Sequence, residues 1–138
     1  MGEKILIIDD EENIRFTLGR FLQAEGYEVA SADSYTAAIA NINSTEFDLI
    51  FTDILLKDKT GINVLEEVRN RNLRCPVVVF TGAPNVETAS EAVRLGAFDY
   101  IVKPIRQSTL LRVAGAALQH KAMLQEREAY RQNLEAIF

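Results

Sequence analysis

Short runs of apolar, often β-branched residues recur along the chain, and polar segments with helical spacing separate them. The runs have the length of strands and cover residues 4–8, 27–30, 47–52, 76–80 and 98–102. Between them, apolar residues recur three or four positions apart, which predicts amphipathic helices. Because the strands are almost continuously apolar, both faces of their sheet should be covered by helices. We therefore expect an α/β fold with five parallel strands and right-handed crossovers.

Local signals place several helix ends. Ser34 is suited to begin a helix over about 35–43, while Gly26 and Gly96 are suited to end helices. The last helix begins near Gln107 and continues to residue 138, which is further than covering the sheet requires. The pattern predicts a domain over 1–120 and a helical linker over 121–138 toward a further domain. A frayed terminal helix is the alternative.

Composition narrows the possible functions. The chain has 138 residues, 48% of them hydrophobic, and a formal net charge of −5, which suits one globular domain and argues against non-specific binding of nucleic acid. The single cysteine, Cys75, excludes an internal disulfide and favours a reducing compartment. No apolar run is longer than a strand, so we expect a cytoplasmic protein without a membrane span.

Polar residues that could take part in chemistry follow or end four of the predicted strands. Asp9 and Asp10 come after the first, Asp53 after the third, Thr81 after the fourth and Lys103 after the fifth. The carboxyl ends of parallel strands share one edge of the sheet, where ligands bind in open α/β folds. We expect these five side chains to meet in one crevice.

Three neighbouring carboxylates repel one another unless a cation joins them, and hard oxygen ligands suit Mg²⁺. Lys103 can pair with phosphoryl oxygens, and Thr81 can donate a hydrogen bond to one of them. Asp53 then has the surroundings of a carboxylate nucleophile that attacks phosphorus and forms an acyl phosphate.

The motifs together resemble the receiver domain of bacterial two-component response regulators over residues 4 to about 120. They are Asp9-Asp10, Asp53 with Gly61 eight residues later, Thr81-Gly82 and Lys103-Pro104. The resemblance implies a flavodoxin-like (CheY-like) fold with strand order 2-1-3-4-5. It also implies a phosphoacceptor switch, not an enzyme acting on other substrates: the domain catalyses only its own phosphorylation and slow dephosphorylation.

The resemblance also assigns roles to residues. It implies Mg²⁺ bound by Asp10, Asp53 and the backbone carbonyl of Leu55, with Asp9 contributing through water. A sensor histidine kinase or a phosphotransfer protein would phosphorylate Asp53. Lys103, preceding a cis peptide bond to Pro104, would contact the phosphoryl group.

A hydroxyl and an aromatic residue form the switch of this family, and Thr81 and Tyr100 match them. On phosphorylation, Thr81 should draw toward the phosphoryl group and Tyr100 should turn inward. This change is a shift between two packings of one fold.

The sequence departs from the family pattern after the phosphoacceptor. Leu56 and Lys57 stand where Met-Pro is frequent, and the loss of proline predicts a more mobile loop. Leu55 and Ala83 occupy positions that help to position the hydrolytic water, and neither side chain can hydrogen-bond water, so we expect slow self-dephosphorylation. The charges that follow, Asp58 and Lys59, are expected to be solvated, and His120 is expected on the surface.

The output of the switch is less well defined by the sequence. Residues 121–138 are similar to linkers that lead into PAS-type sensory domains. Residues 96–100 resemble receivers of transcription activators of the nitrogen-regulation type. The two resemblances imply such an activator or a hybrid sensor kinase as candidates for the full protein. A phosphorylation-dependent homodimer fits the resemblance, and nothing in these residues predicts direct DNA binding.

Two other functions compete with the switch. A haloacid-dehalogenase-type phosphatase also uses an aspartate nucleophile, but it needs a second aspartate where this chain has Leu55. A phosphorylation-independent, receiver-like adaptor is opposed by the complete acidic set. A dinucleotide-binding role is excluded because no glycine-rich loop follows the first strand.

Overall fold

The computed structural model describes residues 2–71 and 74–137. Strands and helices alternate along the chain, ten elements in all within the described ranges, and five strands form one parallel sheet of order β2-β1-β3-β4-β5. This order and the α/β class confirm the predicted fold. The elements are β1 (Lys4–Ile8), α1 (Glu12–Ala24), β2 (Glu28–Ala32), α2 (Tyr35–Ser44), β3 (Leu49–Asp53), α3 (Gly61–Asn70), β4 (Val77–Thr81), α4 (Val86–Arg94), β5 (Asp99–Val102) and α5 (Gln107–Ile137).

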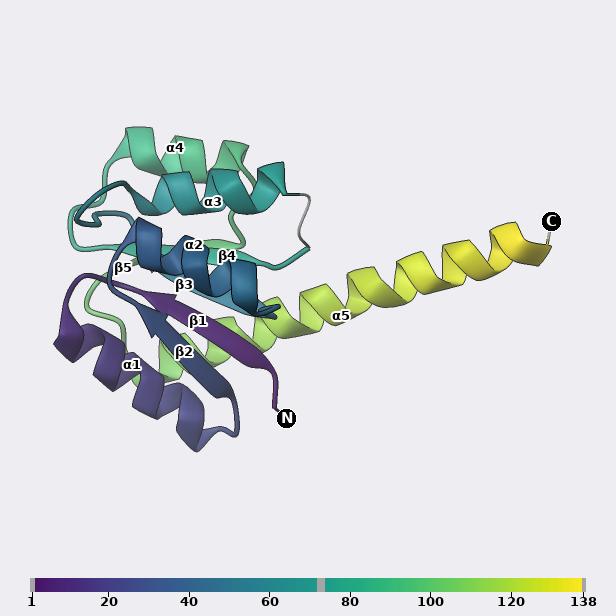
Figure 1. The fold of residues 1–138 in the computed structure, drawn as a ribbon, viewed down its shortest axis with the longest axis horizontal. Helices are drawn as coiled ribbons and strands as arrows, with labels where there is room; N and C mark the ends of the chain where they lie inside the picture. Colours follow the sequence, from purple (N-terminus) through teal and green to yellow (C-terminus); the bar gives the residue numbers. More distant parts are fainter. Residues whose placement is uncertain (1, 72–73, 138) are drawn as a thin grey trace.

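Helices cover both faces of the sheet, with α2, α3 and α4 on one face and α1 and α5 on the other (Figure 1). Alternate residues of each central strand serve different cores: Leu6 and Ile8 face one, while Ile5 and Ile7 face the other. All four side chains are fully buried. Burying one aliphatic side chain of this size contributes about 1.5–3 kcal/mol, so β1 alone makes a large contribution to the stability of the fold.

Side chains and glycines fix the helix ends. The Ser34 hydroxyl accepts a hydrogen bond from the Ala37 N–H at 3.1 Å, as expected for the residue that begins α2. Gly26 and Gly96 follow the ends of α1 and α4 with φ angles of 93° and 78°, a conformation that only glycine adopts without strain. The predicted stops are confirmed.

Most strand boundaries differ from the sequence prediction by one or two residues. The prediction for β3 ended at Thr52, whereas Asp53 is the last residue of this strand and pairs in register with Phe80 of β4. The second strand was predicted over 27–30 but runs from Glu28 to Ala32. Its central residues are only half-buried, because β2 is an edge strand, and the weaker apolar signal explains the misplacement.

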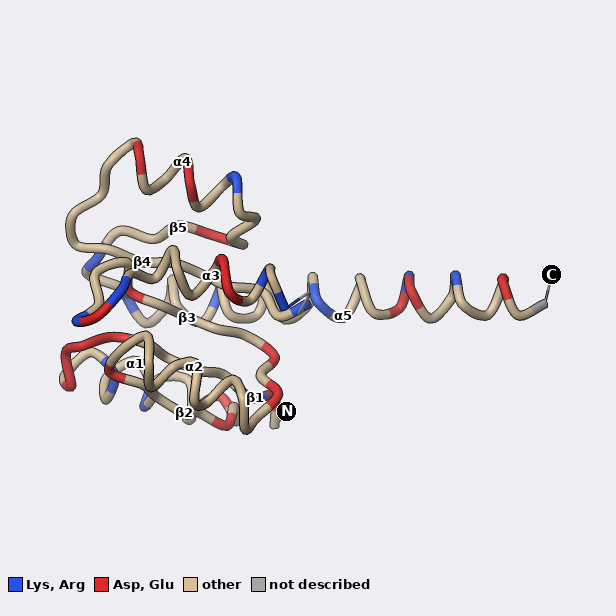
Figure 2. The backbone as a smooth tube through the Cα atoms, turned by 45° about the horizontal axis from the view of Figure 1, so that its top comes forward, with Lys and Arg blue, Asp and Glu red and all other residues tan. Residues whose placement is uncertain are grey.

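Helix α5 is continuous over 31 residues, and its second half projects away from the sheet (Figure 1). Acidic and basic residues alternate along this projection (Figure 2). An ion pair between Arg74 and Glu128 and another between Lys121 and Asp48 connect α5 to the body of the domain. The division at residue 120 stays a prediction, and residue 138 of the predicted linker lies outside the described residues. No helix within 2–71 and 74–137 combines the length and apolar character needed to cross a membrane.

Candidate functional site

The acidic residues predicted to meet do so at the carboxyl edge of the sheet. Asp9, Asp10 and Asp53 each offer a carboxylate oxygen, and these oxygens lie within 4.8 Å of one another. Asp9 is fully buried and Asp53 is 5% exposed, whereas Asp10 is exposed. The two strands that deliver them, β1 and β3, are hydrogen-bonded neighbours, and this pairing brings the carboxylates together although more than forty residues separate them in sequence.

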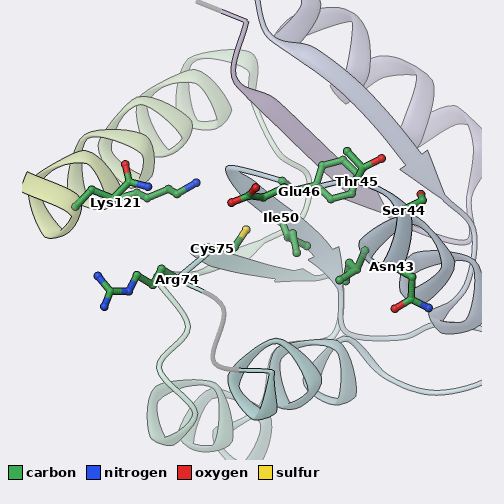
Figure 3. A pocket seen from close by; sticks show the side chains of 11 residues that line it. Asn43, Ser44, Thr45, Glu46, Ile50, Arg74, Cys75 and Lys121 are labelled. Carbon is green, nitrogen blue, oxygen red and sulfur yellow. The ribbon is translucent and has the colours of Figure 1, made fainter. Parts of the chain in front are cut away.

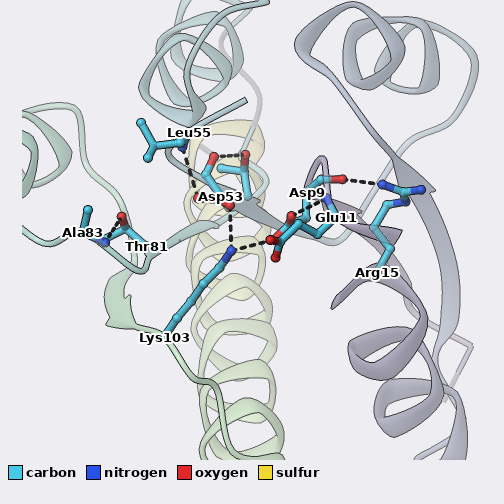
Figure 4. A network of polar contacts seen from close by, with 9 residues as sticks. Asp9, Glu11, Arg15, Asp53, Leu55, Thr81, Ala83 and Lys103 are labelled. Carbon is cyan, nitrogen blue, oxygen red and sulfur yellow. Dashed lines mark hydrogen bonds and ion pairs between the residues drawn. The ribbon is translucent and has the colours of Figure 1, made fainter. Parts of the chain in front are cut away.

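Lys103 lies between two of these carboxylates (Figure 4). Its Nζ donates to Oδ2 of Asp53 at 2.7 Å and to Oδ2 of Asp9 at 2.9 Å. Burial alone would lower the pKa of Lys103, but the hydrogen bonds and charges of Asp53 and Asp9 outweigh it and raise this pKa. Lys103 precedes a cis peptide bond to Pro104, as predicted. The ammonium group is therefore firmly charged and held in the acidic cluster.

Asp9 is held in place from several directions. Its Oδ1 accepts a hydrogen bond from the backbone N–H of Glu11 at 2.8 Å, and its carbonyl accepts one from Arg15 at 2.7 Å (Figure 4). Burial raises the pKa of Asp9, and the hydrogen bonds from Glu11 and Lys103 offset this only in part. An additional cation nearby would stabilise the charged form of this buried carboxylate.

The two carboxylate oxygens of Asp53 have different partners. Its Oδ1 accepts a hydrogen bond from the Leu55 N–H at 3.1 Å, while Oδ2 faces Lys103. The Leu55 side chain is 59% exposed, so it stands at the open side of the crevice. The structure thus places Leu55 beside Asp53, and the role of its carbonyl as a metal ligand stays a prediction.

Gly61 packs directly against the backbone of Asp53. A Cβ atom at this position would lie 2.2 Å from the Asp53 carbonyl oxygen, a distance that no side chain tolerates. The N–H of Gly61 donates to the carbonyl of Ile54 at 2.8 Å. Glycine eight residues after Asp53 therefore allows α3 to begin against the end of β3.

The two predicted switch residues lie on β4 and β5. Thr81 is 1% exposed, and its hydroxyl accepts a hydrogen bond from the Ala83 N–H at 3.0 Å, which leaves its own proton available to another acceptor (Figure 4). Tyr100 is half-buried, packs against the core under α3 and α4, and has its hydroxyl 3.0 Å from Oγ1 of Thr88.

Asp58 and Lys59 are exposed loop charges, as expected, but they also make contacts that the sequence did not predict. Asp58 accepts hydrogen bonds from the first turn of α2, and the Lys59 ammonium lies 4.6 Å from the centre of the Tyr35 ring. Both residues are exposed, so no apolar pattern marks them, and their partners are more than twenty residues away. His120 is exposed as expected.

Two hollows lie away from the acidic cluster. One, of about 520 Å³, lies at the amino ends of β3 and β4, and Figure 3 shows Cys75 and Lys121 beside it. The other, of about 810 Å³, runs between α5 and the segment after α4. Among the described residues, each of these hollows is lined by a single carboxylate, Glu46 in the first and Glu128 in the second, in contrast to the three that meet around Asp53.

Comparison with known proteins agrees with this geometry. Residues 5–114 match the family model described as response regulator receiver domain. The chain is 37% identical to the regulatory protein AtoC of Escherichia coli K12 over 123 residues, which are 89% of this chain and 27% of AtoC. The chain thus spans about a quarter of the length of the curated relatives it matches.

Solved structures give the same result. The crystal structure of NtrX from Brucella abortus has a TM-score of 0.88 at 36% identity, and the match covers 95% of this chain and 30% of that one. A receiver domain protein (CheY-like) from Methanospirillum hungatei JF-1 has a TM-score of 0.86 at 29% identity, with 89% of this chain and 98% of that chain covered. The sequence motifs, the strand order and these matches agree, and the chain belongs to the response regulator receiver domains, the phosphoacceptor switches of two-component signal transduction.

Proposed function

We propose that Asp53 is the residue that accepts the phosphoryl group. The observation that carries this proposal is the position of its carboxylate, nearly buried at the end of β3 and hydrogen-bonded to the ammonium group of Lys103. An Asp53 oxygen forms a bond to phosphorus while the bond from phosphorus to the donor breaks. With a phosphohistidine donor, that bond is P–N and the leaving imidazole takes up a proton. The partner is therefore a sensor histidine kinase or a phosphotransfer protein.

Lys103 and Thr81 then stabilise the product. The ammonium group is already 2.7 Å from Asp53 and moves with little rearrangement to an oxygen of the phosphoryl group. The hydroxyl of Thr81 keeps its proton for the same group, because its hydrogen bond with Ala83 uses only a lone pair. Hydrogen-bond donors that are already in position account for most of the rate enhancement in phosphoryl transfer.

Mg²⁺ is the cofactor that fits the acidic cluster. The donor set consists of oxygen ligands, which this cation prefers, and the three carboxylate oxygens are close enough to share one ion. Asp10, Asp53 and the Leu55 carbonyl would hold it, with Asp9 acting through water. When bound, the ion would neutralise repulsion between the carboxylates and an incoming phosphoryl group. Asp9 would meanwhile orient the other groups from its buried position.

The switch in this proposal couples Thr81 to Tyr100. Thr81 draws toward the phosphoryl oxygen, and Tyr100 turns into the space beside β4. The hydroxyl of Tyr100 leaves Thr88 in this movement, which alters the surface formed by α4, β5 and α5. Two packings of one core, separated by a few kcal/mol, are enough for such a signal.

The signal passes to an output domain in the same chain. We place the receiver in residues 1–120 and the linker in 121–138, with a transcription-activating domain or a PAS-type sensory domain beyond it. The name of the transcriptional regulatory protein ZraR of Escherichia coli K12, to which the chain is 35% identical over 116 residues, supports the first choice. The same proposal includes a homodimer that forms on phosphorylation. It also includes a cytoplasmic location, which the lone Cys75 favours.

Phosphorylation by acetyl phosphate with Mg²⁺, followed by intact mass, tests the function. We expect one phosphate on the wild type and none on Asp53→Asn. Asp99→Asn, at the amino end of β5, is the matched control and should be phosphorylated normally. Absence of any adduct on the wild type, together with failure to bind beryllofluoride, would replace the switch with a phosphorylation-independent adaptor.

A further inference from the structure

The loop between β3 and α3 begins beside the phosphoacceptor. Leu55 forms an isolated antiparallel bridge with Thr60, so the two ends of the loop are held together at its base. Leu55 also donates its N–H to Asp53, at 3.1 Å. The backbone that connects the site to the tip of this loop therefore passes through Leu56 and Lys57, and neither has the fixed φ angle of proline.

Asp58 fastens the tip of this loop to α2. Its Oδ1 accepts a hydrogen bond from the N–H of Tyr35 at 2.9 Å, and its Oδ2 accepts from the N–H and the hydroxyl of Thr36 at 3.0 and 2.7 Å. Oδ1 also accepts from the N–H of Lys59 at 2.9 Å. One carboxylate thus joins segments more than twenty residues apart.

These hydrogen bonds complete the amino end of α2. The first N–H groups of a helix have no partner within it, and the hydroxyl of Ser34 accepts from the N–H of Ala37 alone among the hydrogen bonds described for α2. Asp58 supplies acceptors for Tyr35 and Thr36, at the end of the helix where the peptide dipoles favour negative charge. Hydrogen bonds from Thr36, first among several causes, hold the pKa of Asp58 well below its ordinary value.

The other contacts of the loop tip are weaker. Lys57 pairs with Asp33 at 3.4 Å, and both side chains are about half exposed, so solvent screens this pair strongly. Lys59 lies over the Tyr35 ring at 4.6 Å, an exposed contact of modest strength. Among the described contacts of the tip, the carboxylate of Asp58 therefore makes the strongest connection.

We propose that Asp58 is a positioning residue for the metal-dependent phosphorylation of Asp53. By holding the loop tip against α2, it fixes the backbone at Leu55, whose carbonyl would be a ligand of the metal in the proposed function on which this inference rests. Asp58 thus restrains the loop directly after Lys57, the position at which proline is frequent in this family. Occupation of the metal site in turn affects the amino end of α2.

Residues that orient a metal ligand without touching the metal typically affect metal affinity by one to two orders of magnitude when they are removed. Coupling of this kind is reciprocal. Binding of Mg²⁺ should therefore alter the amide groups of Tyr35 and Thr36, although neither lies in the acidic cluster. A cap that only stabilised α2 would produce neither effect.

Calorimetric titration of the unphosphorylated chain with Mg²⁺ tests the proposal without any phosphoryl transfer. We expect Asp58→Ala to weaken Mg²⁺ binding by about tenfold. Ser34→Ala is the matched control, because it removes the other cap of the same helix and leaves the loop attached. It should change the Mg²⁺ affinity less than about twofold. Equal affinities for wild type and Asp58→Ala, or equal losses in both variants, would overturn the proposal.

The kinetics of phosphorylation by acetyl phosphate provide a second readout. In Asp58→Ala the Mg²⁺ concentration for half-maximal rate should rise about tenfold, while the rate at saturating Mg²⁺ stays nearly unchanged. A lower saturating rate with unchanged Mg²⁺ dependence would contradict the positioning role. If the wild type itself took no phosphate, the proposed function would fail, and calorimetry would still decide the role of Asp58.

Should Asp58→Ala not fold, amide resonances of the wild type decide the question. The Tyr35 and Thr36 signals should shift on addition of Mg²⁺, and Asp58→Asn, which keeps one acceptor oxygen, should reduce the shift. Unchanged Tyr35 and Thr36 signals at a Mg²⁺ concentration that shifts the Leu55 signal would overturn the proposal.

Discussion

The hydroxyl group of Tyr100 lies 3.0 Å from Oγ1 of Thr88, so a side-chain hydrogen bond connects β5 to the first turn of α4. Thr88 also contacts Asn85, the residue that caps α4. The orientation of Tyr100 is therefore tied to the start of this helix, and a turn of the ring inward must break the bond.

A double-mutant cycle of Tyr100→Phe and Thr88→Val measures this bond. Each substitution should lower the free energy of unfolding by about 0.5–1.5 kcal/mol in the unphosphorylated protein. The double variant should lose less than the sum of the two single losses, because both single variants remove the Tyr100–Thr88 bond, while Thr88→Val also removes the contact with Asn85. Urea denaturation of the four proteins gives the coupling energy. The coupling should vanish in the beryllofluoride-bound state, and a coupling that persists there would contradict the proposed inward turn.

A methyl group at position 61 should damage both the fold and the site. The Cβ atom of Gly61→Ala would lie 2.2 Å from the carbonyl oxygen of Asp53, so α3 or the end of β3 must shift. Such overpacking costs about 1–3 kcal/mol, and we also expect slower phosphorylation by acetyl phosphate. Urea denaturation checks the first effect.

Gly115→Ala is the control for this substitution. Its Cβ atom would meet nothing within 4 Å, on an exposed position of α5. Alanine is a better helix former than glycine by about 1 kcal/mol, so this variant should be slightly more stable than the wild type. If both variants lost stability equally, the close approach of Gly61 to Asp53 would not be the cause.

The sequence was sufficient to predict the sheet and the members of the acidic cluster. Continuous apolar runs identify central strands such as β1 and β3, and parallel pairing then brings their carboxyl ends to one edge. Asp9, Asp53 and Lys103 could be predicted to meet on this basis alone. Their individual hydrogen bonds could not, because they depend on distances of tenths of an ångström that no residue pattern encodes.

The contacts of Asp58 and Asp48 were not predictable in the same way. A residue that caps its own helix has a local signature, as Ser34 does. Asp58 caps a helix that begins more than twenty residues earlier, and no periodic pattern records this pairing. Asp48 likewise binds Lys121 of α5 at 2.7 Å, a contact that arises only when α5 packs across the sheet.

Asp48 should contribute to stability in a pH-dependent manner. Burial raises its pKa, but hydrogen bonds from Lys121 and from the N–H of Lys4 outweigh burial and lower the pKa below 3.8. The stabilisation that Asp48 gives the fold is therefore present at pH values above about 3.8. It is lost as the pH falls through the lower pKa that Asp48 has in the folded state.

Urea denaturation of wild type and Asp48→Asn from about pH 6 to about pH 3 checks this sign. The wild type should be more stable near pH 6, and the difference should shrink below pH 4. Lys121→Met should show the same trend, since it removes one of the two partners. A difference that stayed constant or grew toward acid would mean that the charge of Asp48 does not stabilise the fold.

The acyl phosphate should persist for minutes or longer. Hydrolysis requires a water molecule in line with the bond to Asp53, and the side chains nearest that path in the family pattern are Leu55 and Ala83. Leu55 is 59% exposed at the mouth of the crevice, and neither side chain can hydrogen-bond water. We expect Leu55→Asn to accelerate loss of the phosphate several-fold, because an amide can orient the attacking water.

Intact mass at intervals after removal of acetyl phosphate, with Mg²⁺ present, gives the lifetime of the phosphorylated protein. Val86→Asn is the matched control, since Val86 is an exposed apolar residue, 80% accessible, at the start of α4. It should leave the lifetime unchanged. Loss of phosphate from the wild type within seconds would show that the chain positions water by other groups. A lifetime shortened equally by both variants would trace the effect to a loosened fold, because Val86 lies in α4 and outside the acidic cluster.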